Sequence, residues 1–319
     1  MPKYLITRLL SSIPALVGAT ILIFLAMCVM PGDPLATITS ETAGTHVLTE
    51  QELEAVRASL GLDKPLYMQY LSWMADVARG DFGRSFWRQD PISATIFRRF
   101  PITAQIALMA IIISWLVGIP IGLISALKRN SWLDNISRSL VLVFVAVPSF
   151  WIGMLFITFT VLVLNWKPPM TITYFWDDPL RNLQMTFWPA TTMGIGLGAG
   201  IARMARSATL AVMHTDYIRT ARAKVLRQSV IVFRHMLRNA LLPGITLSGM
   251  SFGGLLGGSV AVERVFAVPG LGQSMVLALG ERDWMMIQNM VLLYAVIFSV
   301  MNLLVDLSYG IRDPRIRTE

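Results

Sequence analysis

Phe100–Leu127, with the sequence FPITAQIALMAIIISWLVGIPIGLISAL, decides the fold because it contains no Asp, Glu, Lys, Arg or His. About 20 apolar residues in a helix are enough to cross the hydrocarbon core of a bilayer, and this stretch is longer. Five further intervals of at least 20 residues also lack all five residue types: 9–32, 139–166, 182–202, 239–262 and 284–305. The sequence therefore predicts an all-α, polytopic membrane protein with six transmembrane helices.

The overall composition agrees with this prediction. Hydrophobic residues make up 55% of the 319 residues and charged residues only 14%, against about a quarter in a soluble domain. A net charge of +8 is expected when basic residues gather in the cytoplasmic loops of a membrane protein, so we expect no nucleic-acid partner.

The distribution of Lys and Arg predicts the orientation. With the N-terminus inside, the segments that lie between charge-free intervals on the cytoplasmic side (1–8, 128–138, 203–238 and 306–319) hold 16 Lys and Arg against 5 acids, whereas the external segments hold 11 against 14. Both termini are therefore predicted to be cytoplasmic. The predicted segments are a cytoplasmic N-terminus (1–8), a first span (9–30), an external loop (31–99), a second span (100–127), a cytoplasmic loop (128–138), a third span (139–164), an external loop (165–185), a fourth span (186–205), a cytoplasmic loop (206–238), a fifth span (239–262), an external loop or re-entrant turn (263–283), a sixth span (284–306) and a cytoplasmic tail (307–319).

The long external segment is predicted to be partly helical. Thr49 and Glu52 have the spacing of a capping box before a helix that ends near Gly61. A second helix is expected from Pro65 to about Gly80, and its apolar face would carry Leu66, Tyr70, Met74 and Val77. This segment either caps the membrane domain or offers a docking surface to a soluble partner.

Small residues recur in the spans at the spacing that lets helix backbones approach closely. The pairs and triplet are Gly118/Gly122, Gly194/Gly198, Gly196/Gly200 and Gly249/Gly253/Gly257. Pro120 and Pro148 are expected to bend the second and third spans.

The charge-free spans are compatible with two classes of protein besides a pore-forming subunit. A proton-driven carrier is disfavoured because only Asp306 places an ionisable group near a span, although a sodium site made of carbonyl and hydroxyl oxygens stays open. An intramembrane serine hydrolase would use Ser251, which lies in the G-x-S-x-G match GMSFG. A serine nucleophile needs a nearby base, and His46, His214 and His235 all lie outside the predicted spans.

Nucleotide and metal sites lack the residues they need. No Gly-Lys dipeptide occurs in the chain, so a Walker-A loop is absent, and the three histidines and one cysteine have no metal-ligand spacing. We expect no cofactor and no metal to be bound by this chain. A transport protein of this kind would draw its energy from another subunit.

The densest positive charge lies at Asp216–Pro243, DYIRTARAKVLRQSVIVFRHMLRNALLP, between two apolar segments. Asp216 can cap a helix in which Ile218, Ala221 and Val225 form a short apolar stripe among basic residues. Such a helix could lie flat on the anionic inner leaflet, or it could dock into a groove of a cytoplasmic partner.

Eight motifs in order along the chain resemble the membrane permease subunits of oligopeptide/dipeptide/nickel-type ABC importers. They are TRLL (7–10), PGDP (31–34), LGLDKPLYMQYL (60–71), RGDFGRSF (79–86), DYIRTARAK (216–224), RNALLP (238–243), VFAVPGLG (265–272) and IRDPRIR (311–317). The resemblance implies a type I ABC importer permease architecture with a permease core at 100–308, in the cytoplasmic (inner) membrane.

The resemblance further implies that the basic segment holds a coupling helix that docks on an ATPase subunit. The residues that map onto it are Asp216, Tyr217, Arg219, Thr220, Ala221, Arg222, Lys224 and Val225. Val225 replaces the glycine usual in the family, and valine would be strained at a positive φ by roughly 1–2 kcal/mol. We therefore expect the helix to run on through residue 225 or to turn elsewhere.

The same resemblance implies the rest of the machine. A second homologous permease, two ATPase subunits that use ATP and Mg, and an external solute-binding protein would complete it, with this chain non-catalytic. The loop with Val265, Phe266, Pro269, Gly270, Leu271 and Gly272 would either meet substrate leaving the binding protein or form a plain turn between spans. Peptides are the expected substrate, with nickel, glutathione or another small solute as alternatives.

Overall fold

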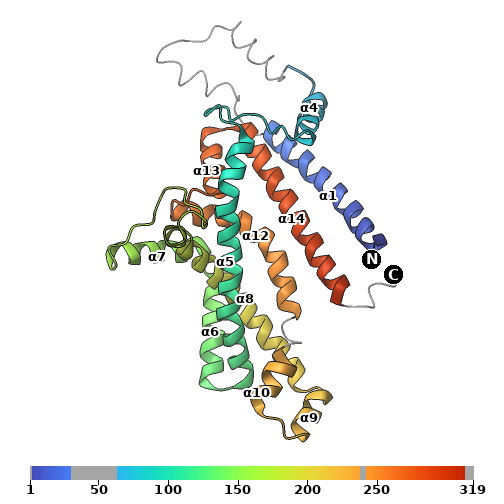
Figure 1. Ribbon diagram of the computed structural model, residues 1–319, viewed down its shortest axis with the longest axis vertical. Helices are drawn as coiled ribbons and strands as arrows, with labels where there is room; N and C mark the ends of the chain where they lie inside the picture. The colour runs from blue at the N-terminus through green and yellow to red at the C-terminus, as the bar shows by residue number, and fades with distance from the viewer. Residues whose placement is uncertain (1, 30–62, 238–241, 313–319) are drawn as a thin grey trace. The chain divides into compact units, whose positions relative to one another are not determined.

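A computed structural model describes residues 2–29, 63–237 and 242–312 (Figure 1). The described part of the chain is helical apart from turns and one isolated β-bridge between Arg84 and Pro91. The predicted all-α fold class is therefore confirmed. The predicted helix before Gly61, with Thr49 and Glu52, lies outside the described residues.

The described helices carry the labels of Figure 1. They are α1 (Pro2–Val29), α4 (Leu66–Ala78), α5 (Ile92–Leu127), α6 (Trp132–Ala146), α7 (Ser149–Leu162), α8 (Pro179–Met213), α9 (Asp216–Ala223), α10 (Gln228–Val230), the π-helix η1 (Ile231–Met236), α12 (Leu242–Val265), α13 (Leu271–Glu281) and α14 (Trp284–Arg312).

Three described helices contain stretches long and apolar enough to cross a membrane: Leu10–Val29, Ile92–Leu127 and Trp284–Val305. The bent pair α6 and α7 supplies a fourth span if it crosses as one unit. The count of six spans stays a prediction.

Pro148 bends the predicted third span, as expected. It follows the extended residue Val147, and the axes of α6 and α7 differ by 100° across this break. Proline lacks the N–H that would continue α6, and it disfavours a helical conformation at the residue before it. At Pro120 the helix is not broken, since α5 continues through it, and a bend at this residue stays a prediction.

The chain divides into two compact units, and unit 1 comprises residues 1–100 and 274–299. Helix α4 lies where the sequence predicted it, and Tyr70, Met74 and Val77 of the predicted apolar face are half-buried, whereas Leu66 is 53% exposed. Trp73, on the same side of the helix, is buried and its Nε1 donates a 3.3 Å hydrogen bond to Asn289 Oδ1.

Unit 2 comprises residues 101–273 and 300–319 and contains both predicted sites. Its helices α5 and α8 approach closely at small residues. A methyl group on Gly118 or Gly122 would overlap the backbone carbonyl of Gly198 or Ala202, respectively. Two of the predicted glycine pairs, Gly118/Gly122 and Gly194/Gly198, therefore do form a packing face.

Candidate functional site

The predicted coupling residues lie on and just after α9, a separate short helix at the end of α8 (Figure 1). Thr215, in an extended conformation, is the N-cap, so Asp216 is the first helical residue and not the cap that the sequence suggested. Asp216 in the first turn and Arg222 in the last turn both have favourable signs for the helix dipole.

The apolar side of α9 packs against its own chain. Ile218 is 0% exposed and Ala221 6% exposed. They form one cluster with the buried residues Leu123 of α5 and Ile231, Val232 and Met236 of η1. Ile218 and Ala221 are therefore not available to a partner's groove or to lipid, because they already have neighbours within unit 2. Val225, the third residue of the predicted stripe, is 89% exposed, and docking of the helix stays a prediction.

The side of α9 that stays exposed carries three basic residues and one acidic residue, so its net charge is positive. The exposed predicted residues are Asp216, Tyr217, Arg219, Thr220, Arg222, Lys224 and Val225. Arg219 forms an ion pair with Asp216 at 3.5 Å, and both side chains are largely exposed, so this pair adds little stability. Ile218 and Ala221, on the opposite side of α9, pack against the chain and fix the orientation of this exposed face.

Val225 adopts the left-handed conformation that glycine would normally supply. Helix α9 ends at Ala223, Lys224 is its C-cap, and Val225 has φ +53° with its N–H donating to the carbonyl of Arg222 at 2.9 Å. The expectation that the helix runs on through 225 or turns elsewhere is wrong. A β-branched residue in this region is strained by roughly 1–2 kcal/mol, and packing of the rest of the segment must offset that cost.

A buried ion pair ties α8, from which α9 follows, to α6. Arg206 Nε and an Nη donate to the two carboxylate oxygens of Asp134 at 2.9 Å each, and Ser125 of α5 donates to the same carboxylate. Asp134 is fully buried and lies in the predicted cytoplasmic loop 128–138. The hydrogen bonds from Arg206 and Ser125 hold the pKa of its carboxyl well below the usual range.

Sequence reasoning missed this ion pair because it treated the charges of Asp134 and Arg206 only as contributions to the orientation. One signal was present, since Asp134 is the only acid in a loop that otherwise carries Lys128, Arg129 and Arg138. A lone carboxylate among cations at the end of a predicted span is typical of a structural partner for arginine.

The second predicted site, the loop at Val265–Gly272, is packed inside unit 2. Phe266, Val268 and Leu271 are fully buried. The side chains of this loop are therefore largely unavailable to an external protein. Contact with a delivered substrate stays a prediction, and the burial favours the alternative of a turn between helices.

Glu263 holds this loop in place. Its carboxylate accepts hydrogen bonds from Thr103 Oγ1 at 2.8 Å and from the backbone N–H of Gln273 at 3.1 Å. Thr103 in turn accepts from the N–H of Leu271 at 2.8 Å. A side chain at Gly270 would overlap the Glu263 carboxylate, which explains a glycine at that position. The predicted loop or re-entrant turn also contains a helix, α13, directly after these contacts.

The two predicted sites are separate in the fold. Helix α12 lies between them in the chain. The coupling residues at 216–225 come before α12, and the loop anchored by Glu263 begins at the C-terminal end of α12. The structure thus joins the residues within each set but does not bring the two sets together.

Comparison with known proteins identifies relatives along the entire chain. Residues 118–318 match the family described as "Binding-protein-dependent transport system inner membrane component", and residues 1–107 match the corresponding N-terminal family. A putative peptide transport system permease protein of Brucella abortus (strain 2308) is 38% identical over 317 residues, which is 99% of both chains. The glutathione transport system permease protein GsiC of Escherichia coli (strain K12) is 36% identical over the same length and share.

A solved structure has a similar fold. An inward-facing conformation of the MetNI methionine ABC transporter, in its native crystal form, contains a chain that matches with a TM-score of 0.56. The match covers 68% of the present chain and 95% of that chain at 19% sequence identity, so it bears on the fold alone.

Proposed function

We propose that this chain, which belongs to the family of inner membrane components of binding-protein-dependent transport systems, forms half of a pathway for peptides. Its membership of that family makes it the permease subunit of an ABC importer. The observation that carries the substrate is the 38% identity, over 99% of both chains, to a permease named for peptide transport. Glutathione, itself a peptide, is the substrate in the name of another relative.

We propose that the exposed basic face of α9 docks on an ATPase subunit. Its buried face is fixed by Ile218 and Ala221, so the helix can act as a rigid extension of unit 2. Only His214 and Thr215 separate it from α8, whose position is fixed in turn by the pair between Arg206 and Asp134. A displacement of α9 by the ATPase would therefore be passed to α8 with little loss in flexible linkers.

We propose the rest of the transporter from the family to which this chain belongs. ATP and Mg²⁺ would bind to two partner ATPase subunits, a second homologous permease would supply the other half of the pathway, and an external binding protein would deliver the substrate. Closure of the ATPase pair would favour one of two permease states through its differential affinity for them. The present chain would bind no nucleotide.

The proposed orientation places α9 and both termini on the cytoplasmic side. Single cysteines at Thr45 and Ser229, on a Cys28→Ala background, should react with impermeant reagents from opposite sides of the membrane. Reaction of both cysteines from the periplasmic side of intact spheroplasts would contradict the orientation.

Uptake by the reconstituted transporter tests the substrate. Proteoliposomes that contain this chain with its partner subunits, supplied with the binding protein and ATP, should accumulate labelled peptides, and omission of ATP should abolish uptake. Accumulation of nickel but of no peptide, glutathione included, would contradict the proposed substrate while leaving the permease assignment intact.

A further inference from the structure

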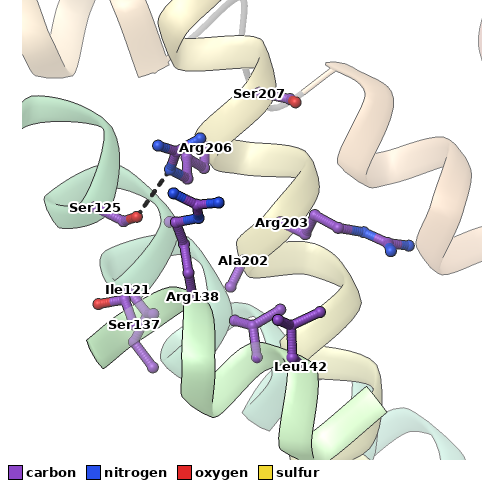
Figure 2. A pocket seen from close by; sticks show the side chains of 11 residues that line it. Ile121, Ser125, Ser137, Arg138, Leu142, Ala202, Arg203, Arg206 and Ser207 are labelled. Carbon is purple, nitrogen blue, oxygen red and sulfur yellow. Dashed lines mark hydrogen bonds between the residues drawn. The ribbon is translucent and has the colours of Figure 1, made fainter. Parts of the chain in front are cut away.

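A pocket of about 230 Å³ lies among α5, α6 and α8, beside the predicted cytoplasmic loop 128–138 (Figure 2). Its polar lining consists of three arginines and three serines: Arg138, Arg203, Arg206, Ser125, Ser137 and Ser207. This pocket is distinct from α9 and from the loop at Val265–Gly272, and Arg206 is the residue of its lining that the proposed coupling also uses.

The pocket carries an excess of positive charge. Arg206 has the carboxylate of Asp134 as its partner. The ion pairs within the described part of the chain include none for Arg138 or Arg203. No acidic side chain lines the pocket itself, so Arg138 brings a positive charge to it without a charge partner. Arg203 also belongs to the lining, but in Figure 2 its side chain extends away from Arg138 and Arg206.

The positions of these groups suit an oxyanion. In Figure 2 the guanidinium groups of Arg138 and Arg206 lie at the same end of the pocket, although like charges repel. Ser125 lies at this end too and accepts a hydrogen bond from Arg206 Nε at 3.0 Å. Ser125 donates its own hydroxyl hydrogen to Asp134, so the groups left to meet an anion here are the guanidiniums of Arg138 and Arg206. Guanidinium groups that lie close together are groups that proteins use to bind phosphate.

The remaining wall of the pocket is apolar. Ile121, Val141 and Leu142 contribute to it, and Leu142 is 66% exposed on the outside of α6. A free phosphate ion would use only the arginine end and would leave this wall in contact with water. A phospholipid satisfies both parts, because its phosphate meets the guanidinium groups and its acyl chain covers the apolar side chains.

We propose that this pocket binds the phosphate of an anionic glycerophospholipid of the inner leaflet. Basic pockets between transmembrane helices on the cytoplasmic side are typical sites for anionic headgroups. The proposal rests on the predicted orientation of loop 128–138 and is independent of the substrate carried by the transporter.

The test is native mass spectrometry of the full-length chain, purified with the subunits that accompany it and stripped of lipid. Phosphatidylglycerol should bind saturably and more tightly than phosphatidylcholine. Arg138→Gln combined with Arg203→Gln should weaken phosphatidylglycerol binding by up to roughly 25-fold, because each cation near an anionic headgroup contributes roughly a factor of five. Arg206 is kept, since its loss would leave Asp134 unpaired.

The matched control is Lys128→Gln combined with Arg129→Gln. It removes the same amount of charge from the loop that carries Arg138, and these exposed residues do not line the pocket. The control should retain the wild-type affinity to within about twofold. An equal loss in both double variants would overturn the proposal, because the loop would then attract lipid by its general charge alone.

Three further results would also overturn the proposal. The first is equal binding of phosphatidylglycerol and phosphatidylcholine by the wild-type protein, which needs no variant to fold. Inorganic phosphate could bind in place of phosphatidylglycerol and displace it, which would identify a free-anion site. The pocket variant could release its partner subunits with lipid binding unchanged, which would identify a subunit contact.

Discussion

Replacing Val225 by glycine should stabilise the segment that contains α9. Val225 has φ +53° and is 89% exposed, so the substitution removes strain without removing buried apolar surface. Relief of the left-handed conformation contributes roughly 1–2 kcal/mol, and the greater freedom of glycine in the unfolded chain offsets roughly 0.5–1 kcal/mol of it. The net expectation is a local stabilisation of about 1 kcal/mol.

Hydrogen exchange of the α9 amides, read by mass spectrometry on the purified protein, measures this local stability. A gain of about 1 kcal/mol slows exchange by about fivefold. Lys224→Gly is the control, because Lys224 is also exposed but has φ −77° and carries no left-handed strain. It should accelerate exchange. Exchange in Val225→Gly that is as fast as in wild type, or faster, would refute the strained turn at 225.

Two further predictions concern how unit 2 is held together. Asp134→Asn leaves Arg206 partly buried without its charge partner and should cost roughly 3–5 kcal/mol of unfolding free energy, whereas Asp216→Asn, which breaks an exposed pair, should change it by less than about 1 kcal/mol in chemical denaturation. Gly122→Val inserts a side chain against the carbonyl of Ala202 and should lower the yield of folded protein in size-exclusion chromatography. Gly196→Val is the control and should not lower the yield, because a Cβ at Gly196 meets nothing within 4 Å in the described chain. Equal yields of the two variants would contradict the α5–α8 packing.

The sequence predicted the existence of α9 and its apolar positions, because Ile218 and Ala221 follow the helical period. It could not predict what those positions contact. Periodicity defines a face of a helix, but Leu123 and Ile231, which cover this face, are distant in sequence or separated from it by a turn. The sequence therefore suggested a partner protein where the chain itself supplies the packing.

The conformation of Val225 was misjudged for a different reason. Local propensity disfavours a positive φ at valine, but the packing of α9 and η1 on either side fixes the course of the chain between them. Glu263 illustrates a third limit, since an acidic residue at the end of a predicted span was assigned to an external loop. Its partners Thr103 and Gln273 come from other elements, so only the folded chain reveals a buried anchor.

The burial of Ala221 makes Ala221→Asp unsuitable as a test of coupling. Ala221→Asp would place a carboxylate in the cluster around Ile218 and disturb the packing of α9 within its own chain, so loss of transport in that variant would not identify docking. Substitutions on the exposed face avoid this ambiguity, because they leave the cluster intact.

Cysteine cross-linking from the two faces of α9 tests the central claim most directly. On a Cys28→Ala background, a cysteine at the exposed Thr220 should cross-link to the ATPase subunit in the assembled transporter, and its yield should change when ATP is added. A cysteine at the buried Ile218 should give no such product. A product from Ile218 in the folded complex, or none from Thr220 and the other exposed positions between 217 and 225, would contradict the assignment of α9 as the coupling helix.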